Sequence, residues 1–473
     1  MKKGYLAFDF GASSGRLVLG MMSNGKLELQ EVHRFPNEPV YANGTMYWDF
    51  LRLFHEMKQG LKKAATLKDV EIQAIGIDTW GVDGIWLDEK DQLIGSPIHY
   101  RDDRTSKIMD EFYTKITDEK LYELTGIQKT SFNTIYQLYY DKTKNEIIKN
   151  HGKTWLFMPD LFGFLLTGNK YNEYSIASTG ALLDPVTKEY HLEVFETLGI
   201  PMEGMQKVVM PGTIVGMLTK EMQEETGLGE VAVVAVGSHD TASAVAATPL
   251  EGTEDIYLVC GTWCLMGMEL QEPCITPETR EYNFTNEGGI EGSIRLLKNI
   301  NGLWFLQQLK KVWNEQGENI DFPDMIAAVK ACDHEYRIDA ADDRFMAPKN
   351  MAKEIIKNCE EKYGVTLEGI GAITKAAYNG LGELYKVTTE HFEKLTGKDV
   401  ATIRMIGGGI KDEYLCQKVA DVTGKRVVTG PIEASAIGNI MMQMKAVGDI
   451  ATIAEGRDVI RKSFESKEYN KNA

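Results

Sequence analysis

The stretch Asp9-Phe10-Gly11-Ala12-Ser13-Ser14-Gly15-Arg16 decides the fold, because it separates two short apolar runs near the start of the chain. Tyr5–Asp9 comes before it and Arg16–Met21 comes after it. The second run is rich in β-prone residues and breaks off near Asn24, so it predicts a strand rather than the beginning of a helix. The chain therefore opens with two strands joined by a glycine-bearing turn.

A second strand–turn–strand is predicted in the later half of the chain. Asp255–Val259 and Trp263–Met268 are its strands, and Cys260-Gly261-Thr262 forms the bend. Between and after the two hairpins, strand-like and helix-like segments alternate, which is typical of an α/β protein. Further strands are predicted at 71–77, 231–236, 402–406 and 426–429, and helices after Asp49 and at 242–247, 371–395 and 433–444.

The pattern is interrupted once between the halves, at Thr248-Pro249-Leu250-Glu251-Gly252. We therefore expect two α/β domains, residues 1–247 and 248–473, each opening with a strand–turn–strand. A cleft between two such lobes is a common place for a ligand.

Composition excludes several classes of protein. The 473 residues are 43% hydrophobic and 26% charged, with 45 Gly and 13 Pro, as in soluble globular proteins. The formal net charge of −17 makes duplex nucleic acid and anionic membranes poor partners. The most apolar stretch, near Val231–Val236, is far shorter than the ~20 residues of a membrane helix. Six scattered cysteines fit neither a disulfide scaffold nor a zinc site, so we expect reduced thiols in a cytoplasmic protein.

The turn of the first hairpin is a candidate phosphate site. Its small residues let a ligand approach the backbone, and Ser13 and Ser14 add hydroxyl donors. Arg16 can neutralise phosphate oxygens, and Asp9 can hold Mg²⁺ directly or through water. The stretch is not a Walker A sequence. Taken alone, it favours an ordinary tight turn whose glycines supply positive φ and whose serines cap local amides.

The second candidate is Gly237-Ser238-His239-Asp240-Thr241, between a buried strand and a helix. A carboxylate at the end of a strand in an α/β sheet lies where ligands usually bind. Asp240 could accept the proton of a substrate hydroxyl that attacks phosphorus. The alternative is that Asp240 caps the helix, although Thr241 can serve as that cap and leave Asp240 free.

Three further stretches are candidates of lower specificity. Asp78-Thr79-Trp80-Gly81-Val82-Asp83 suits a sugar, which offers hydroxyl donors and an apolar face, but a hairpin with a packed tryptophan also fits. His99–Thr105 favours a solvated turn with internal ion pairs. Asn299 or Asn301 could bind a ligand or only cap the helix that follows, and Gly407-Gly408-Gly409 permits close approach to the backbone.

Taken together and in order, these motifs resemble those of the FGGY carbohydrate kinases. The resemblance covers nearly the whole chain and rests on FDFGASSGR (8–16), WDF (48–50), IGIDTWGVD (75–83), YRDDRT (100–105), MPD (158–160), SHDTASAV (238–245), GTWCLMG (261–267), TNEGG (285–289), LKNINGLW (297–304), IGGG (406–409) and GPIEAS (430–435). It implies two ribonuclease H-like domains of the actin/hexokinase ATPase type with an interdomain cleft. Residues 1–247 would carry the phosphate loop, the sugar site and the catalytic aspartate, and 248–473 would bind the nucleotide.

The resemblance is closest to the branch of the family that phosphorylates L-rhamnulose. It implies transfer of the γ-phosphoryl group of MgATP to the sugar's 1-hydroxyl, giving L-rhamnulose 1-phosphate and ADP in L-rhamnose degradation. Small molecules, and neither nucleic acid nor membrane, would be the partners. The residues it implies are Asp240 as proton acceptor; Gly81, His239, Asp240, Thr241 and Asn299 for the sugar; Ala12, Ser13, Ser14, Gly15, Arg16, Thr262, Gln307 and Gly408 for ATP; and Asp9 for Mg²⁺.

Two other functions remain open at this point. One is a kinase for another ketose, L-fuculose or L-xylulose, and the other is a sugar sensor or chaperone-type ATPase on the same fold. The sequence departs from the wider family at Gln137, where many members carry Lys, and at Cys264, often a Ser. No disulfide is carried over from a relative.

Overall fold

The computed structural model describes residues 1–346 and 348–472 and shows an α/β protein. Ala473, the last residue of the predicted second domain, and Ala347 lie outside the described residues. The chain forms two compact units, and both are discontinuous in sequence. The first unit contains 1–249, 269–296 and 433–464, and the second contains 250–268, 297–432 and 465–473. The expected domains 1–247 and 248–473 stay a prediction.

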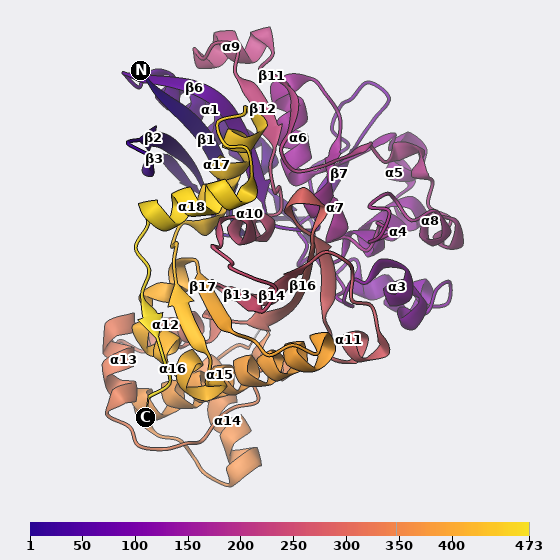
Figure 1. Ribbon diagram of the computed structural model, residues 1–473. Helices are drawn as coiled ribbons and strands as arrows, with labels where there is room; N and C mark the ends of the chain where they lie inside the picture. The colour runs from indigo at the N-terminus through magenta and orange to yellow at the C-terminus, as the bar shows by residue number, and fades with distance from the viewer. Residues whose placement is uncertain (347, 473) are drawn as a thin grey trace. The chain divides into compact units, whose positions relative to one another are not determined.

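The first unit is built on a mixed sheet (Figure 1). Its central strand pairs with an antiparallel neighbour on one side and a parallel one on the other. From one edge to the other, the strands are β11 (Thr213–Met217), β12 (Ala232–Ala235), β6 (Val70–Thr79), β1 (Lys2–Phe10), β2 (Ser14–Ser23) and β3 (Lys26–Pro36). The predicted opening hairpin is therefore confirmed as β1 and β2.

Alternation of side chains along β1 sends two kinds of residue to opposite faces of this sheet. Leu6, Phe8 and Phe10 belong to a buried apolar cluster that also contains residues of α1 (Phe50–Ala65) and α6 (Met158–Thr167). Asp9 therefore points to the other face, which α17 (Ala434–Ala446) covers through contacts with β1 and β6. The catalytic candidates share that face.

Short strand pairs and further helices complete the first unit. The strand pairs are β4 (Pro39–Ala42) with β5 (Thr45–Trp48), β7 (Gly84–Leu87) with β8 (Thr154–Phe157), and β9 (Asn172–Glu173) with β10 (Val208–Val209). The helices are α2 (Met109–Phe112), α3 (Asp118–Thr125), α4 (Thr134–Lys144), α5 (Glu146–His151), α7 (Tyr174–Ser178), α8 (Leu192–Leu198), α9 (Lys220–Thr226), α10 (Asp240–Ala247), α11 (Pro277–Glu281) and α18 (Ile453–Ser463). Short 3₁₀ turns lie at Ser106–Ile108, Met202–Gly204 and Ile290–Gly292.

A second sheet repeats the strand order of the first. Its strands are β15 (Thr285–Gly288), β16 (Ile294–Asn301), β14 (Trp263–Leu270), β13 (Asp255–Cys260), β17 (Thr402–Ile406), β18 (Arg426–Thr429) and β19 (Glu468–Tyr469). As with β1, the strand β13 pairs with its hairpin partner β14 on one side and runs parallel to β17 on the other. The second predicted strand–turn–strand is thus confirmed.

The helices of the second unit include one of 28 residues. They are α12 (Trp304–Glu315), α13 (Phe322–Lys330), α14 (Met351–Tyr363), α15 (Gly369–Thr396) and α16 (Glu413–Thr423), with 3₁₀ turns at Asp343–Phe345 and Gly408–Lys411. The periodic stretch predicted as a helix at 371–395 is therefore confirmed within α15.

Two later segments of the chain return to the first unit. In 269–296, the Phe284 carbonyl accepts a hydrogen bond from the Tyr122 hydroxyl at 3.0 Å, and the Gly288 amide donates to Ser178 Oγ at 2.7 Å. In 433–464, α17 packs on α10, and Figure 1 shows this yellow helix among the indigo strands. A Cβ at Gly438 would lie 1.8 Å from the Ser243 carbonyl oxygen, so only glycine permits this close approach.

Over the described residues, none of the helices combines the length and the apolar character needed to span a membrane. The six cysteines are free thiols.

Candidate active site

The turn of the first hairpin gathers the predicted phosphate residues. Gly11 N donates to Ser14 O at 2.9 Å and closes the turn, and Ala12 and Ser13 are exposed at its tip. The Asn37 amide donates to Gly11 O at 2.8 Å and supports the turn from β3's end. Ala12 and Ser13 are therefore the accessible tip of this turn, and Ser14, Gly15 and Arg16 continue from it into β2, where Gly15 is buried.

Asp9 and Arg16 face each other at the base of this turn. They are Cα partners in the β1–β2 pair, and Arg16 Nη2 lies 2.7 Å from Asp9 Oδ2. Arg16 Nη1 also forms an ion pair with Glu433, which precedes α17. Two carboxylates thus orient the guanidinium group beside the turn, where it can meet a phosphate.

Three aspartates from three neighbouring strand ends form an acidic group. Asp9 and Asp78 are Cα partners on the parallel strands β1 and β6. Thr79 N donates to Ser238 O at 2.9 Å, which brings the start of α10 and its first residue, Asp240, to the same edge. Burial raises the pKa of Asp78 well above its usual value, and the charges of Asp9 and Asp240 add to the rise. The three carboxyl groups therefore influence one another electrostatically.

The fully buried Asp78 has one satisfied and one unsatisfied oxygen. Its Oδ2 accepts a hydrogen bond of 2.5 Å from the Asn439 amide of α17, whereas Oδ1 has no hydrogen-bond partner. An orphaned carboxylate oxygen next to Asp9 is the type of ligand that Mg²⁺ prefers. In residues 1–346 and 348–472, no three His, Cys, Asp or Glu side chains form a metal-binding group. Mg²⁺ bound with a nucleotide usually takes one or two carboxylates, and Asp9 and Asp78 are the neighbouring pair in the acidic edge formed by Asp9, Asp78 and Asp240.

Asp240 begins α10 without capping it. The position before the helix is His239, and the structure shows no side-chain capping bond there. Instead, the Thr241 hydroxyl donates to Asp240 Oδ1 at 3.0 Å. Both helix-cap alternatives, Asp240 and Thr241, are therefore wrong. The Asp240 side chain is 30% exposed, so a ligand can reach it. Burial raises its pKa, His239 opposes the rise and Asp9 adds to it.

His239 lies between Asp240 and a buried ion pair. Its Nε2 is 3.5 Å from Asp240 Oδ1, and its Nδ1 is 3.3 Å from Glu287 Oε2. Arg295 Nη2 lies 3.2 Å from the same Nδ1 and 3.1 Å from Glu287 Oε2. A Cβ built on Gly81 would lie 3.4 Å from His239 Nε2. Gly81, His239, Asp240 and Thr241, which were predicted to bind the sugar, thus lie together.

The buried carboxylate of Asp83 holds the turn that carries Gly81, so Asp83 is not a second acid that faces a ligand. Asp83 Oδ2 accepts hydrogen bonds from Trp48 Nε1 at 2.6 Å and Trp80 Nε1 at 3.0 Å, and Asp83 Oδ1 accepts one from the Gln137 amide at 3.0 Å. Burial raises the pKa of Asp83 to about 6, although these donors oppose the rise. Trp80 is therefore a packed tryptophan, as the alternative to a sugar site predicted, and Asp83 positions the turn.

The stretch His99–Thr105 is not the solvated turn that its charges suggested. His99, Arg104 and Thr105 are buried, and Arg104 Nη2 donates to Gln137 Oε1 at 2.8 Å. Distant residues therefore replace the internal ion pairs expected from the local sequence. Gln137, the departure from the wider family, joins Arg104 to Asp83.

Three of the residues predicted to bind ATP, Thr262, Gln307 and Gly408, belong to the second unit, whereas Ala12–Arg16 belong to the first. Thr262 lies in the β13–β14 turn, and its hydroxyl donates to Gln307 Oε1 of α12 at 3.2 Å. Gly408 follows β17, the parallel neighbour of β13, and a Cβ there would contact nothing within 4 Å. Asn299 lies on β16, and α12 begins at Trp304 with no side-chain cap, so the predicted capping role of Asn299 or Asn301 is wrong. The structure brings Thr262 and Gln307 together.

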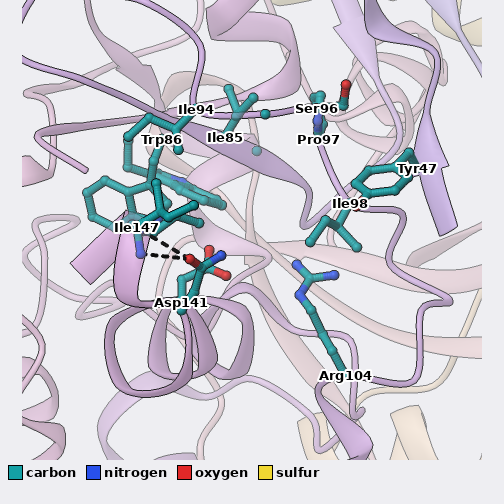
Figure 2. A pocket seen from close by; sticks show the side chains of 15 residues that line it. Tyr47, Ile85, Trp86, Ile94, Ser96, Pro97, Ile98, Arg104, Asp141 and Ile147 are labelled. Carbon is teal, nitrogen blue, oxygen red and sulfur yellow. Dashed lines mark hydrogen bonds between the residues drawn. The ribbon is translucent and has the colours of Figure 1, made fainter. Parts of the chain in front are cut away.

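A pocket of about 330 Å³ in the first unit contains none of the predicted site residues. Figure 2 shows Arg104 and Asp141 on its polar side and Ile94, Ser96 and Pro97 opposite them. Burial raises the pKa of Asp141 to about 6. One of its lining residues, Arg104, donates to Gln137, which in turn donates to Asp83.

Solved structures define the class of protein. The chain is similar to a ligand-bound xylulose kinase from Lactobacillus acidophilus, at 17% identity and a TM-score of 0.84 over 99% of this chain and 94% of the other. It is similar to Plasmodium falciparum glycerol kinase with ADP, at 15% identity and a TM-score of 0.81 over 100% and 95%. The fold is that of the two-domain sugar kinases, with the ribonuclease H-like architecture of the actin-type ATPases.

Family models and curated relatives then give the family. Residues 4–247 match the N-terminal domain of the FGGY family of carbohydrate kinases, and 256–447 match its C-terminal domain. A rhamnulokinase of Oceanobacillus iheyensis is 40% identical over 471 residues, covering 100% of this chain and 99% of that protein. One of Halalkalibacterium halodurans is 41% identical over 464 residues, covering 98% of each. The chain belongs to the FGGY family of carbohydrate kinases, which are phosphotransferases with an alcohol group as acceptor.

Sequence reasoning did not single out Glu287, Arg295 or Asn439 as members of the site. Glu287 stands in the TNEGG stretch and Asn439 follows GPIEAS, so the motifs were visible but their location in the first unit was not. Charged residues at alternate positions of the strand would have indicated a polar face, but Arg295 is the one charged residue between Ser293 and Leu297. Its role becomes visible only through its contact with His239.

Proposed function

We propose that this protein transfers the γ-phosphoryl group of MgATP to the 1-hydroxyl of L-rhamnulose, giving L-rhamnulose 1-phosphate and ADP. The observation that carries this proposal is the similarity, over nearly the whole of both chains, to relatives named rhamnulokinase. The acidic edge of the first unit supports it, because Asp240 does not cap α10 and its side chain is 30% exposed.

Asp240 is the proton acceptor in this proposal. The 1-hydroxyl oxygen forms a bond to the γ-phosphorus, the bond from that phosphorus to the bridging oxygen breaks, and the hydroxyl proton passes to the Asp240 carboxylate. The partial exposure of Asp240 and its place beside His239 support this role. Since the transition state is loose, the proton moves late and an aspartate suffices as the base.

The sugar and nucleotide contacts follow the resemblance residue by residue. Gly81, His239, Thr241 and Asn299 would contact the sugar, and Thr262, Gln307 and Gly408 the nucleotide. The turn Ala12–Arg16 would contact the phosphates, with backbone N–H groups, two hydroxyls and the Arg16 guanidinium. Residues 1–247 would then supply the base and the sugar site, and 248–473 most of the nucleotide site. Its partners would be these small molecules, and ATP and free thiols favour a cytoplasmic location.

Asp9 would hold Mg²⁺, directly or through water, with Asp78 beside it. When bound, the ion would neutralise charge on the transferred phosphoryl group. Asp9 is already 2.7 Å from Arg16, so the side chain that holds the cation and the one that meets phosphate are fixed relative to each other.

The test is an initial-rate assay of ADP release with L-rhamnulose, L-fuculose, L-xylulose and no sugar, each with and without Mg²⁺. We expect the highest kcat/KM with L-rhamnulose and no activity without Mg²⁺. The product should show a phosphomonoester on the C1 oxygen by ³¹P and ¹H NMR. A clearly higher kcat/KM with another ketose would assign that sugar instead. ATP turnover that is indifferent to every sugar would favour the sensor or chaperone-type ATPase.

A further inference from the structure

Arg295 on β16 is a fully buried cation within the first unit, whereas arginine side chains are mostly exposed in proteins. Its side chain has 0% exposure, and its Nε donates to the Gly288 carbonyl at 2.9 Å. Glu287, at 8% exposure, lies 3.1 Å away and supplies the opposite charge. Burial acts to raise the pKa of Glu287, but His239 and Arg295 outweigh it and leave the pKa below its usual value. A buried pair is weak evidence for stability, so it needs another explanation.

The Nη2 group of Arg295 touches two acceptors. It lies 3.1 Å from Glu287 Oε2 and 3.2 Å from His239 Nδ1, and it carries two hydrogens. The same Nδ1 also lies 3.3 Å from Glu287 Oε2, which can only accept, but of these two contacts the one with Arg295 has hydrogen-bond geometry. Since a guanidinium group can only donate, this contact favours an Nδ1 that accepts and carries no proton. The neutral ring then has its proton on Nε2.

Nε2 is the ring nitrogen of His239 that lies nearest the Asp240 carboxylate. It is 3.5 Å from Asp240 Oδ1, and the missing side chain of Gly81 leaves space 3.4 Å from it. With the opposite tautomer, a lone pair on Nε2 would face the Asp240 carboxylate and repel it.

We propose that Arg295 and Glu287 are positioning residues that fix the Nε2–H tautomer of His239 and so orient the Asp240 carboxylate. Arg295 sets the tautomer, and Glu287 holds Arg295 and balances its charge. The charged and titratable groups around the pair Asp240 and His239 are Asp9, Asp78, Glu287 and Arg295. The consequence for catalysis rests on the proposed function, whereas the tautomer does not.

The competing interpretation is that the pair only ties β15 and β16 to the first unit. Another arginine–acid pair offers a matched control, since Arg280 and Asp118 also tie the 269–296 segment to this unit, at 3.3 Å. That pair is partly exposed and is not among the contacts of His239. Removing it tests attachment of the segment without touching the ring.

The experiment is long-range ¹H–¹⁵N NMR of the ¹⁵N-histidine-labelled full chain, with the His239 signals assigned by His239→Asn. We expect the Nε2–H tautomer in the unaltered protein. The double variant Glu287→Gln with Arg295→Met removes both charges together, so neither is left buried alone. In it, we expect His239 to lose that tautomer and kcat to fall roughly 10- to 100-fold, as is typical when a partner that orients a reacting side chain is lost. Asp118→Asn with Arg280→Met should change neither.

A second variant keeps the proposal testable if the double variant does not fold. Arg295→Lys retains a donor and the charge and should retain the Nε2–H tautomer. A proton on Nδ1 in the unaltered protein overturns the proposal. So does an unchanged tautomer in the folded double variant, or a changed tautomer with unchanged kcat. Absence of kinase activity with every sugar would instead refute the proposed function, and the tautomer would still decide this inference.

Discussion

The edges of the two sheets differ in chemistry although their strands follow the same order. The order β3-β2-β1-β6-β12 in one corresponds to β16-β14-β13-β17-β18 in the other. In both, the central strand is antiparallel to its hairpin partner and parallel to the next strand. At or after corresponding strand ends, the first sheet has Asp9, Asp78 and Asp240, and the second has Cys260, Gly407 and Gly430.

The difference indicates a division of labour between equivalent positions. Carboxylates at the first edge can accept a proton and hold a cation, at the cost of burying charge. Glycines at the second edge serve backbone conformation instead: Gly407 has φ 85° and Gly430 has φ 104°, conformations that other residues rarely adopt, and the exposed Gly408 follows Gly407. One topology therefore carries carboxylates at one edge and glycines near the corresponding strand ends of the other.

The largest effect should come from removing the base at the acidic edge. Asp240→Asn keeps the shape of the side chain but cannot accept a proton, so we expect kcat to fall roughly 10²- to 10⁴-fold. Affinities for sugar and ATP should stay within a few-fold, which steady-state assays of ADP release and titration calorimetry would measure. Asp110→Asn, an exposed aspartate of α2, is the control and should change nothing. Near-normal turnover in Asp240→Asn would place the base elsewhere.

The matching change at the glycine edge should act on binding rather than on turnover. Gly408 is exposed, and a Cβ there meets no atom within 4 Å, so Gly408→Ala should leave the melting temperature unchanged. If ATP approaches this backbone, the methyl group should raise the KM for ATP roughly tenfold, a loss of about 1.4 kcal/mol. Gly229→Ala, also with open space around its Cβ, is the matched control. An unchanged KM for ATP would remove Gly408 from the nucleotide site.

The cost of burying charge at the acidic edge should appear in stability. The pKa of Asp78 is raised in the folded protein, mainly by burial and then by Asp9. The free-energy cost of folding with this side chain buried therefore grows as pH rises from about 4. Asp78→Asn should therefore stabilise the protein by roughly 1–3 kcal/mol at pH 8 and by less at pH 5, measured by urea unfolding without Mg²⁺.

Asp449, whose pKa is shifted in the opposite direction, serves as the control for that pH dependence. Burial acts to raise the pKa of Asp449, but Lys3 and Tyr5 outweigh it and lower it. Since this carboxylate is ionised at both pH 5 and pH 8, Asp449→Asn should destabilise the protein equally at the two values. A gain from Asp78→Asn that does not depend on pH would show that packing, and not charge, limits stability at this edge.

The residues of both edges could be predicted because local signals mark them. Glycine-bearing turns between apolar runs predicted both hairpins. Acidic residues at or just after the ends of predicted strands pointed to Asp9, Asp78 and Asp240. Buried partners from distant segments could not be predicted this way. His99–Thr105 has the composition of a surface turn, but Arg104 is buried by Gln137, 33 positions later. The partners of His239 lie about 50 residues further along, in a segment that returns to the first unit.

The smallest effect should come from the thiol at the second edge. Cys260 and Cys264 form the last residue pair before the turn of the second hairpin, the place that Phe10 and Gly15 take in the first. Cys264 is fully buried and accepts a hydrogen bond from the Tyr385 hydroxyl at 3.2 Å. Ser can accept the same bond, so Cys264→Ser should keep kcat within about twofold and lose roughly 1 kcal/mol of stability. Cys264→Ala, which leaves that hydroxyl without its partner, should lose more stability and no more activity. A collapse of kcat in the folded Ser variant would mean that the second edge takes part in the chemistry, and the division between an acidic edge and a backbone edge would fail.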